Sequence, residues 1–164
     1  MNVIANLVAA LVPLILGFIW YNPKVFGNAW MKHGKLSEEE LKGGNMIKIF
    51  GFMILFSVML SFILSSLIIH QMHIDSLLMN EEGFEVVGSE VHNLRTTISE
   101  KYGATFRTPT HGIVHGLFLS IFFILPMIAI NALFELKNFK YIFINAGFWT
   151  VSVTIMSIII SAWR

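Results

Sequence analysis

Residues 49–69 have the sequence IFGFMILFSVMLSFILSSLII, which contains no charged side chain. A helix rises 1.5 Å per residue, so about 20 apolar residues cover the roughly 30 Å hydrocarbon core of a bilayer. Three more apolar runs of this kind lie at residues 3–21, 112–130 and 141–163. Because backbone groups in lipid must satisfy their own hydrogen bonds, each run is predicted to be a transmembrane helix.

The composition supports a membrane protein and excludes several other classes. The chain is 55% hydrophobic and 13% charged, whereas soluble domains are about 25% charged. A net charge of +1 without a Lys/Arg-rich patch argues against nucleic-acid binding. The absence of cysteine excludes disulfides and thiol chemistry. No dinucleotide-binding, P-loop, serine-hydrolase or zinc-protease motif is present, which disfavours an enzyme.

The predicted fold is an all-α, integral membrane four-helix bundle that forms one domain, residues 1–164. We expect the spans at about 3–21, 47–73, 109–134 and 141–163, with a soluble excursion at 74–108. Within the excursion, Ser89 suits a helix N-cap, and apolar residues then recur at helical spacing up to Gly103. This pattern predicts a small amphipathic helix between spans two and three.

The orientation is predicted from the lysines and arginines near the short loops. Seven lie after the first span or in the 135–140 turn, and four lie in the excursion or at the C-terminus. The richer side is expected in the cytoplasm. Both termini and the amphipathic helix are then extracytoplasmic.

Small residues repeat at about four-residue spacing along the predicted spans, which lets membrane helices approach closely. We interpret them as helix-packing positions: Ala5, Ala9, Gly17, Ser57, Ser61, Ser65, Gly112, Gly116 and Ser120. Since so small a bundle has little interior of its own, a homo-oligomer or a partner membrane protein is also expected.

Four histidines lie where the second span leaves the membrane and the third re-enters. They are His70 and His73, spaced i,i+3, and His111 and His115, spaced i,i+4. Imidazoles on neighbouring helices can ligate a transition metal or haem iron. The alternative is that these histidines make hydrogen bonds near the headgroups, beside a helix-packing seam formed by Gly112 and Gly116.

Aromatic and polar side chains gather at the opposite, cytoplasmic end. A polar pocket for a lipid headgroup or small molecule is one interpretation of this set: Trp20, Tyr21, Trp30, Glu135, Asn145 and Trp149. Asn145 needs a partner in lipid, for which Glu135 or Asn131 is expected. The alternative is an aromatic belt with one interhelical hydrogen bond.

Several of these motifs together resemble a known family over nearly the whole chain. They are Trp20-Tyr21-x-Pro23, His111-Gly112-x-x-His115-Gly116, Phe134-Glu135 and Asn145-Ala146-Gly147-Phe148-Trp149. The chain resembles the bacterial membrane proteins grouped as domain of unknown function 1761 (DUF1761). The resemblance implies a four-span protein of the bacterial inner (cytoplasmic) membrane, and it implies no particular activity.

Three functional hypotheses follow. The first is a non-enzymatic multi-pass membrane protein that binds a partner helix, a lipid or a small ligand. The second is a redox or sensor protein that holds a metal ion or haem with the four histidines. The third is a small transporter or channel subunit, in which Pro13 and Pro126 kink two spans.

Overall fold

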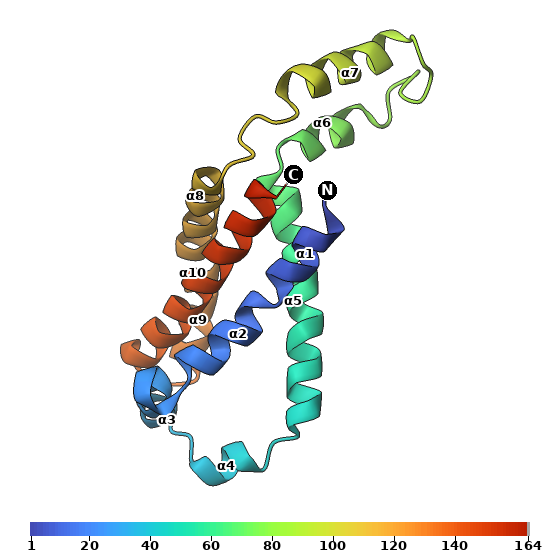
Figure 1. Cartoon of the computed structure of the whole chain (residues 1–164). Helices are drawn as coiled ribbons and strands as arrows, with labels where there is room; N and C mark the ends of the chain where they lie inside the picture. The colour runs from blue at the N-terminus through green and yellow to red at the C-terminus, as the bar shows by residue number, and fades with distance from the viewer. Residues whose placement is uncertain (164) are drawn as a thin grey trace.

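The structure, a computed structural model, describes residues 1–163, and every regular element within them is a helix. Four helices are long and apolar enough to cross a membrane: Val3–Trp20, Met46–Ile68, Pro109–Phe134 and Phe139–Ala162. The N-terminus lies at one end of the molecule with α6 (Gln71–Leu78) and α7 (Glu90–Tyr102), whereas α3 (Asn28–Gly34) and α4 (Glu38–Lys42) lie at the other (Figure 1). We call these the terminal end and the α4 end. The all-helical fold with four membrane-length helices is confirmed.

The first span is interrupted once. Helix α1 (Val3–Ala10) and helix α2 (Val12–Trp20) are separated at Leu11. Pro13 explains the break, because proline lacks an N–H and its ring clashes with the carbonyl four residues earlier. After Trp20 the chain turns through a π-helical segment, η1 (Pro23–Gly27), directly into α3.

The second span ends earlier than expected. Helix α5 (Met46–Ile68) stops, Ile69 is extended with φ −88° and ψ 91°, and α6 begins at Gln71. The sequence analysis expected one helix over residues 47–73. The break carries neither glycine nor proline; instead, the Ile69 side chain is buried among the core residues. Burial of this apolar side chain offsets the loss of regular helix.

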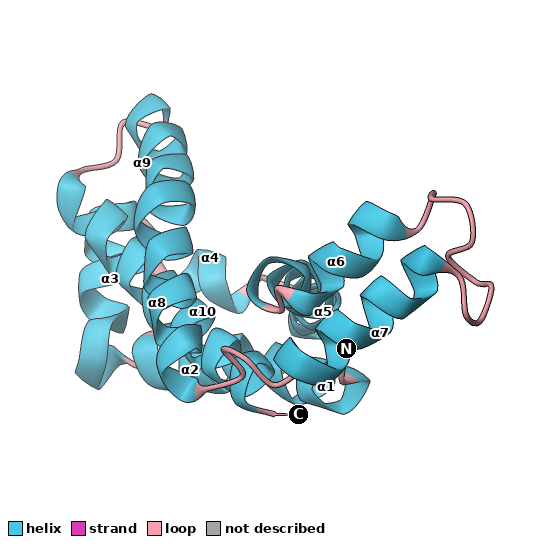
Figure 2. Cartoon of the chain, turned by 90° about the horizontal axis from the view of Figure 1, so that it is seen from above, coloured by secondary structure: helices cyan, strands magenta, loops and turns pink. Residues whose placement is uncertain are grey.

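Helices α6 and α7 form a hairpin that projects away from the long helices (Figure 2). Helix α7 begins after Ser89, as predicted. The Arg95 guanidinium donates to the Asp75 carboxylate at 2.6 Å and joins the two helices. The Gln71 amide donates to two carbonyls at and just after the end of α7, each at 2.9 Å. These contacts fix the start of α6 against the chain that leads into the third span.

The third span consists of α8 (Pro109–Leu119), the π-helical segment η2 (Ser120–Ile124) and α9 (Leu125–Phe134). Thr108 caps α8 and Pro109 takes its first position. The π segment ends two residues before Pro126, and its wider turn relieves the clash of the proline ring with the preceding turn. The fourth span, α10 (Phe139–Ala162), is continuous.

Helices α8 and α10 are the most extensively packed pair, and two glycines make their close approach possible. A Cβ atom on Gly112 would lie 2.5 Å from the Ser157 carbonyl oxygen, and one on Gly116 would lie 2.5 Å from the Thr154 Cα atom. The structure buries all the predicted packing positions except Gly17, which is half-buried: Ala5, Ala9, Ser57, Ser61, Ser65, Gly112, Gly116 and Ser120. The apolar core lies between α1, α5 and α10.

Candidate functional site

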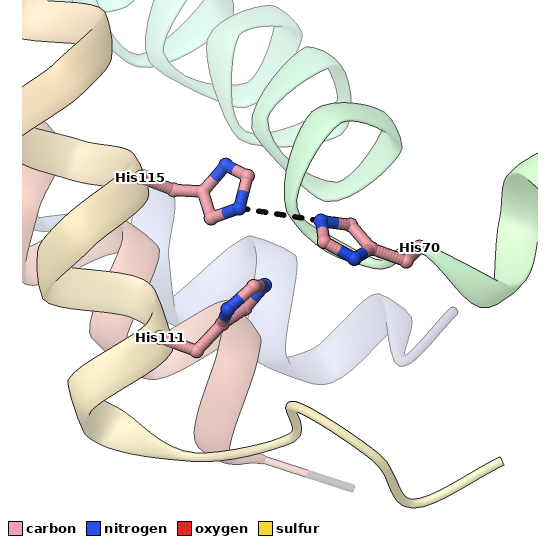
Figure 3. Close-up of side chains that lie close together, drawn as sticks. All are labelled: His70, His111 and His115. Carbon is pink, nitrogen blue, oxygen red and sulfur yellow. Dashed lines mark hydrogen bonds between the residues drawn. The ribbon is translucent and has the colours of Figure 1, made fainter. Parts of the chain in front are cut away.

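Three histidine side chains converge at the terminal end of the molecule. His70 comes from the short link between α5 and α6, and His111 and His115 come from the first two turns of α8. Figure 3 shows the three rings turned toward one another. We call this set the tri-histidine cluster. Forty residues of chain separate His70 from His111, so the tertiary fold brings them together.

The rings of the cluster are in direct contact. The Nε2 atoms of His70 and His115 lie 3.2 Å apart. The ring centroid of His111 lies 4.8 Å from that of His70 and 4.4 Å from that of His115. One ligating nitrogen from each ring can be chosen so that all three lie within 4.8 Å of one another. The cluster is thus a compact set of three nitrogen donors.

A backbone carbonyl orients the third ring. The Nε2 atom of His111 lies 3.3 Å from the carbonyl oxygen of Ile68, at the end of α5. When Nε2 carries the proton and donates to this oxygen, Nδ1 keeps a free lone pair. A hydrogen bond of this kind typically fixes the tautomer of metal-ligating histidines.

The surroundings of His70 favour the neutral imidazole. Burial, followed by the charges of His111 and His73, lowers the pKa of His70 from its usual value. The ring of Phe106 stacks on His111 at 5.2 Å and meets His70 edge-on at 5.7 Å. Phe106 was not singled out in the sequence, because its position depends on a left-handed backbone conformation with φ 62° just before α8.

The structure does not bring the fourth predicted ligand into the cluster. The ring of His73 stacks near that of His70 at 6.3 Å, but His73 is exposed on α6 and outside the set of three convergent nitrogens. The reason is the break at Ile69. The predicted i,i+3 relation assumed one continuous helix, whereas His70 lies before the first turn of α6 and His73 within it.

At the α4 end, four of the six predicted ligand-binding residues lie together. The indole of Trp20 donates to the Ile144 carbonyl at 3.1 Å, and the hydroxyl of Tyr21 donates to the Asn145 side-chain oxygen at 2.9 Å. Trp30 meets the ring of Tyr21 edge-on at 5.0 Å. Burial raises the pKa of the Tyr21 phenol, so its proton remains available for Asn145.

The other two residues lie elsewhere. Glu135 is exposed at the end of α9, and Trp149 packs on Phe148 at 5.2 Å, facing α5 and α9. The expectation that Glu135 or Asn131 pairs with Asn145 is wrong. The amide of Asn145 bonds to Tyr21 and to the carbonyl of Tyr141 one turn earlier, because the chain at the end of α2 lies against this part of α10.

Four helices that are long and apolar enough to cross a membrane are compatible with a multi-pass helical membrane protein. The chain belongs to the family described as protein of unknown function (DUF1761), whose model matches residues 4–161. The resemblance drawn from the sequence motifs is therefore confirmed over nearly the whole chain. No curated protein and no solved structure shows a match.

Proposed function

We propose that this protein is a multi-pass membrane protein that binds a transition-metal ion through His70, His111 and His115. The observation that carries the proposal is the convergence of three imidazoles from two separate spans. Ionisable side chains within membrane-spanning helices are costly to place and commonly functional, and His111 and His115 lie in a helix of membrane-spanning length. Three protein ligands leave one coordination position for water or an exchangeable ligand.

The donor set favours particular ions. Imidazole nitrogens suit Zn²⁺, Cu²⁺ and Ni²⁺, and the set contains neither the thiolates nor the carboxylates that other ions prefer. Two nitrogens bound to one tetrahedral zinc ion lie roughly 3.3 Å apart. The Nε2 atoms of His70 and His115 are separated by 3.2 Å. The widest pair, at 4.8 Å, would close by about 1.5 Å on binding.

The same geometry disfavours haem. Haem iron takes its axial ligands on opposite faces of a flat macrocycle. Here His111 contacts both other rings, with centroids at 4.8 and 4.4 Å, and occupies the space that the macrocycle would need. The metal-ion form of the second hypothesis is therefore preferred over its haem form.

The lysine and arginine distribution supports an orientation for the site. If the lysine-rich α4 end faces the cytoplasm, as the sequence analysis predicts, then the tri-histidine cluster and α7 face the opposite compartment of a bacterial inner membrane. In this arrangement the site takes its ion from outside the cytoplasm. Cysteine labelling at Ser99 on α7 and at Lys42 in α4, with a membrane-impermeant reagent on intact cells, distinguishes the two orientations.

Metal content and affinity test the site. We expect the protein, purified in detergent and loaded with Zn²⁺, to retain about one ion per chain after dialysis. His70→Ala, His111→Ala and His115→Ala should each remove most of this binding. The matched controls are His73→Ala on α6 and His33→Ala, whose ring meets Asn138 at the α4 end; both should bind like the wild type.

Co²⁺ gives a second readout that does not depend on retention, because a tetrahedral Co²⁺ site absorbs visible light. The proposal fails if the folded wild type binds no Zn²⁺, Cu²⁺ or Ni²⁺ above background. It also fails if the three cluster variants bind as well as the controls, in which case the histidines are a hydrogen-bonded packing contact.

A further inference from the structure

A cavity of about 680 Å³ separates α2 from α5 at the α4 end. We call it the α2–α5 cavity. Figure 1 shows the two helices diverging toward this end, with α4 lying across the gap between them. The apolar walls include Phe18 on α2 and Phe50 and Met53 on α5. The volume lies within the range of about 300–1,000 Å³ that is common for small-molecule sites.

One end of the cavity is aromatic. Tyr21 and Trp30 both line it, and their rings meet at 63° with centroids 5.0 Å apart. The Tyr21 hydroxyl is held by Asn145 at 2.9 Å, so the ring has a fixed position. Aromatic rings that border a cavity attract a cation through their electron-rich faces.

The same end carries a negative charge. Among the residues that the structure describes, Glu40 is the one carboxylate that lines the cavity, and none of these lining residues is lysine or arginine. Its Oε2 atom accepts from the Ser37 N–H at 2.8 Å and from the Ser37 hydroxyl at 3.0 Å. These bonds lower the pKa of Glu40 and keep it ionised at neutral pH. Glu40 is exposed, and Lys42, two residues further on, is paired with Glu38 at 3.1 Å. Within residues 1–163, no salt bridge involves Glu40.

We propose that the α2–α5 cavity binds a monocationic amphiphile of the quaternary ammonium or phosphonium class. The apolar body of such a ligand lies between Phe18, Phe50 and Met53, and its positive charge lies beside Glu40, Tyr21 and Trp30. A ligand of this class matches three features of the cavity together: its apolar walls, its aromatic rings and its one carboxylate. An anionic lipid, or the phosphate of a zwitterionic one, would be repelled by Glu40.

This site lies at the opposite end of the molecule from the tri-histidine cluster, so each proposal can fail without the other. The probe is tetraphenylphosphonium, and the control ligand is tetraphenylborate, an anion of almost the same shape. We expect the purified full chain to bind about one phosphonium ion in equilibrium dialysis and to bind the borate much more weakly. Equal binding of the two ions would overturn the proposal.

Substitution of the carboxylate tests the charge. Glu40→Gln removes the charge but keeps a side chain able to complete the cap with Ser37, and because Glu40 is exposed we expect phosphonium binding to weaken by about two- to fivefold. Glu39→Gln, on an exposed residue that does not line the cavity, is the matched control and should have no effect. Unchanged binding by the Glu40 variant would overturn the proposal.

Filling the cavity tests its location. A Cβ atom on Gly17 would lie 3.6 Å from Met53 Cε and 3.9 Å from Phe148 Cε2, so Gly17→Ala fits and should bind normally. Gly17→Leu extends into the cavity and should weaken binding by more than about tenfold. Full binding by the leucine variant, or a co-purified phospholipid that excess phosphonium does not displace, would contradict the assignment.

Discussion

The close contact between α8 and α10 allows a sharp test of the fold and the site together. In Gly112→Ala, the new Cβ atom would meet the Ser157 oxygen at 2.5 Å, the Ile158 Cα atom at 2.6 Å and the Ile158 nitrogen at 2.7 Å. All three are backbone atoms, so no side-chain rotation can relieve the clash. Ordinary contact begins at 3.4 Å, and the two helices must therefore move apart by about 1 Å.

The expected cost follows from two opposing effects. Overpacking of a close interface costs about 1–3 kcal/mol, and a clash with backbone belongs at the upper end of that range. Replacing glycine by alanine inside a helix returns about 1 kcal/mol. The net loss of stability is about 2 kcal/mol, or roughly 30-fold in the ratio of folded to unfolded protein.

Unfolding by SDS in mixed micelles, followed by circular dichroism, measures this change. Gly51→Ala is the matched control, because a Cβ atom on Gly51 meets nothing within 4 Å; it should be neutral or stabilise by up to about 1 kcal/mol. If the two variants unfold within about 0.5 kcal/mol of each other, the close α8–α10 contact is refuted. Since His111 precedes Gly112, the same variant should also bind Zn²⁺ more weakly.

Three further predictions concern single contacts. Protonated imidazole cannot ligate a metal, and the pKa of His70 is lowered below its usual 6.5. Zn²⁺ should therefore remain bound at pH 6.5 and be released only at lower pH. A pH titration of bound Zn²⁺ measures this release. Tyr21→Phe leaves the partly buried side-chain oxygen of Asn145 without its donor at 2.9 Å, so stability in mixed micelles should fall by about 1 kcal/mol. Thr108→Ala removes the side chain that accepts the His111 N–H at 3.3 Å and should cost about 1 kcal/mol.

Matched variants separate these effects from general damage. Tyr102→Phe alters an exposed tyrosine on α7, and Thr110→Ala alters an exposed threonine two residues after the cap; both should leave stability unchanged. Release of Zn²⁺ already above pH 7 would contradict the first prediction. If Tyr21→Phe unfolds like Tyr102→Phe, the second prediction is wrong. If Thr108→Ala unfolds like Thr110→Ala, the third prediction is wrong.

Hydropathy and capping patterns predicted the long helices well. The long helices expected at 109–134 and at about 141–163 agree with the structure to within two residues at each end, and Thr108 and Pro109 begin α8. These features depend on local chemistry: apolar length, a side-chain acceptor before the first turn, and a proline that needs no N–H. Such signals are present in a single stretch of chain.

Features that depend on tertiary packing were not predictable in this way. The break at Ile69 has no turn residue, because burial of one side chain rather than backbone preference causes it. It decides that His70 joins the tri-histidine cluster and that His73 does not. Similarly, Glu40 belongs locally to the helix cap that it forms with Ser37; that it also lines a cavity follows from the angle between α2 and α5, which no local pattern encodes.

The two glycines of α8 have a consequence for how an ion would be selected. Each of these glycines directly follows a histidine, His111 or His115, on this helix. The backbone that carries the two histidines is therefore packed closely against α10. These two donors are preorganised within a helix, whereas His70 lies in a non-helical link that is held through its neighbours, Ile69 in the core and Gln71 beside the end of α7. Ions of different radius would then require different positions of His70. Their affinities would differ mainly through the conformational entropy and strain of the link at residues 69–71. Substitutions that stiffen residues 69–71 should narrow the range of ions accepted.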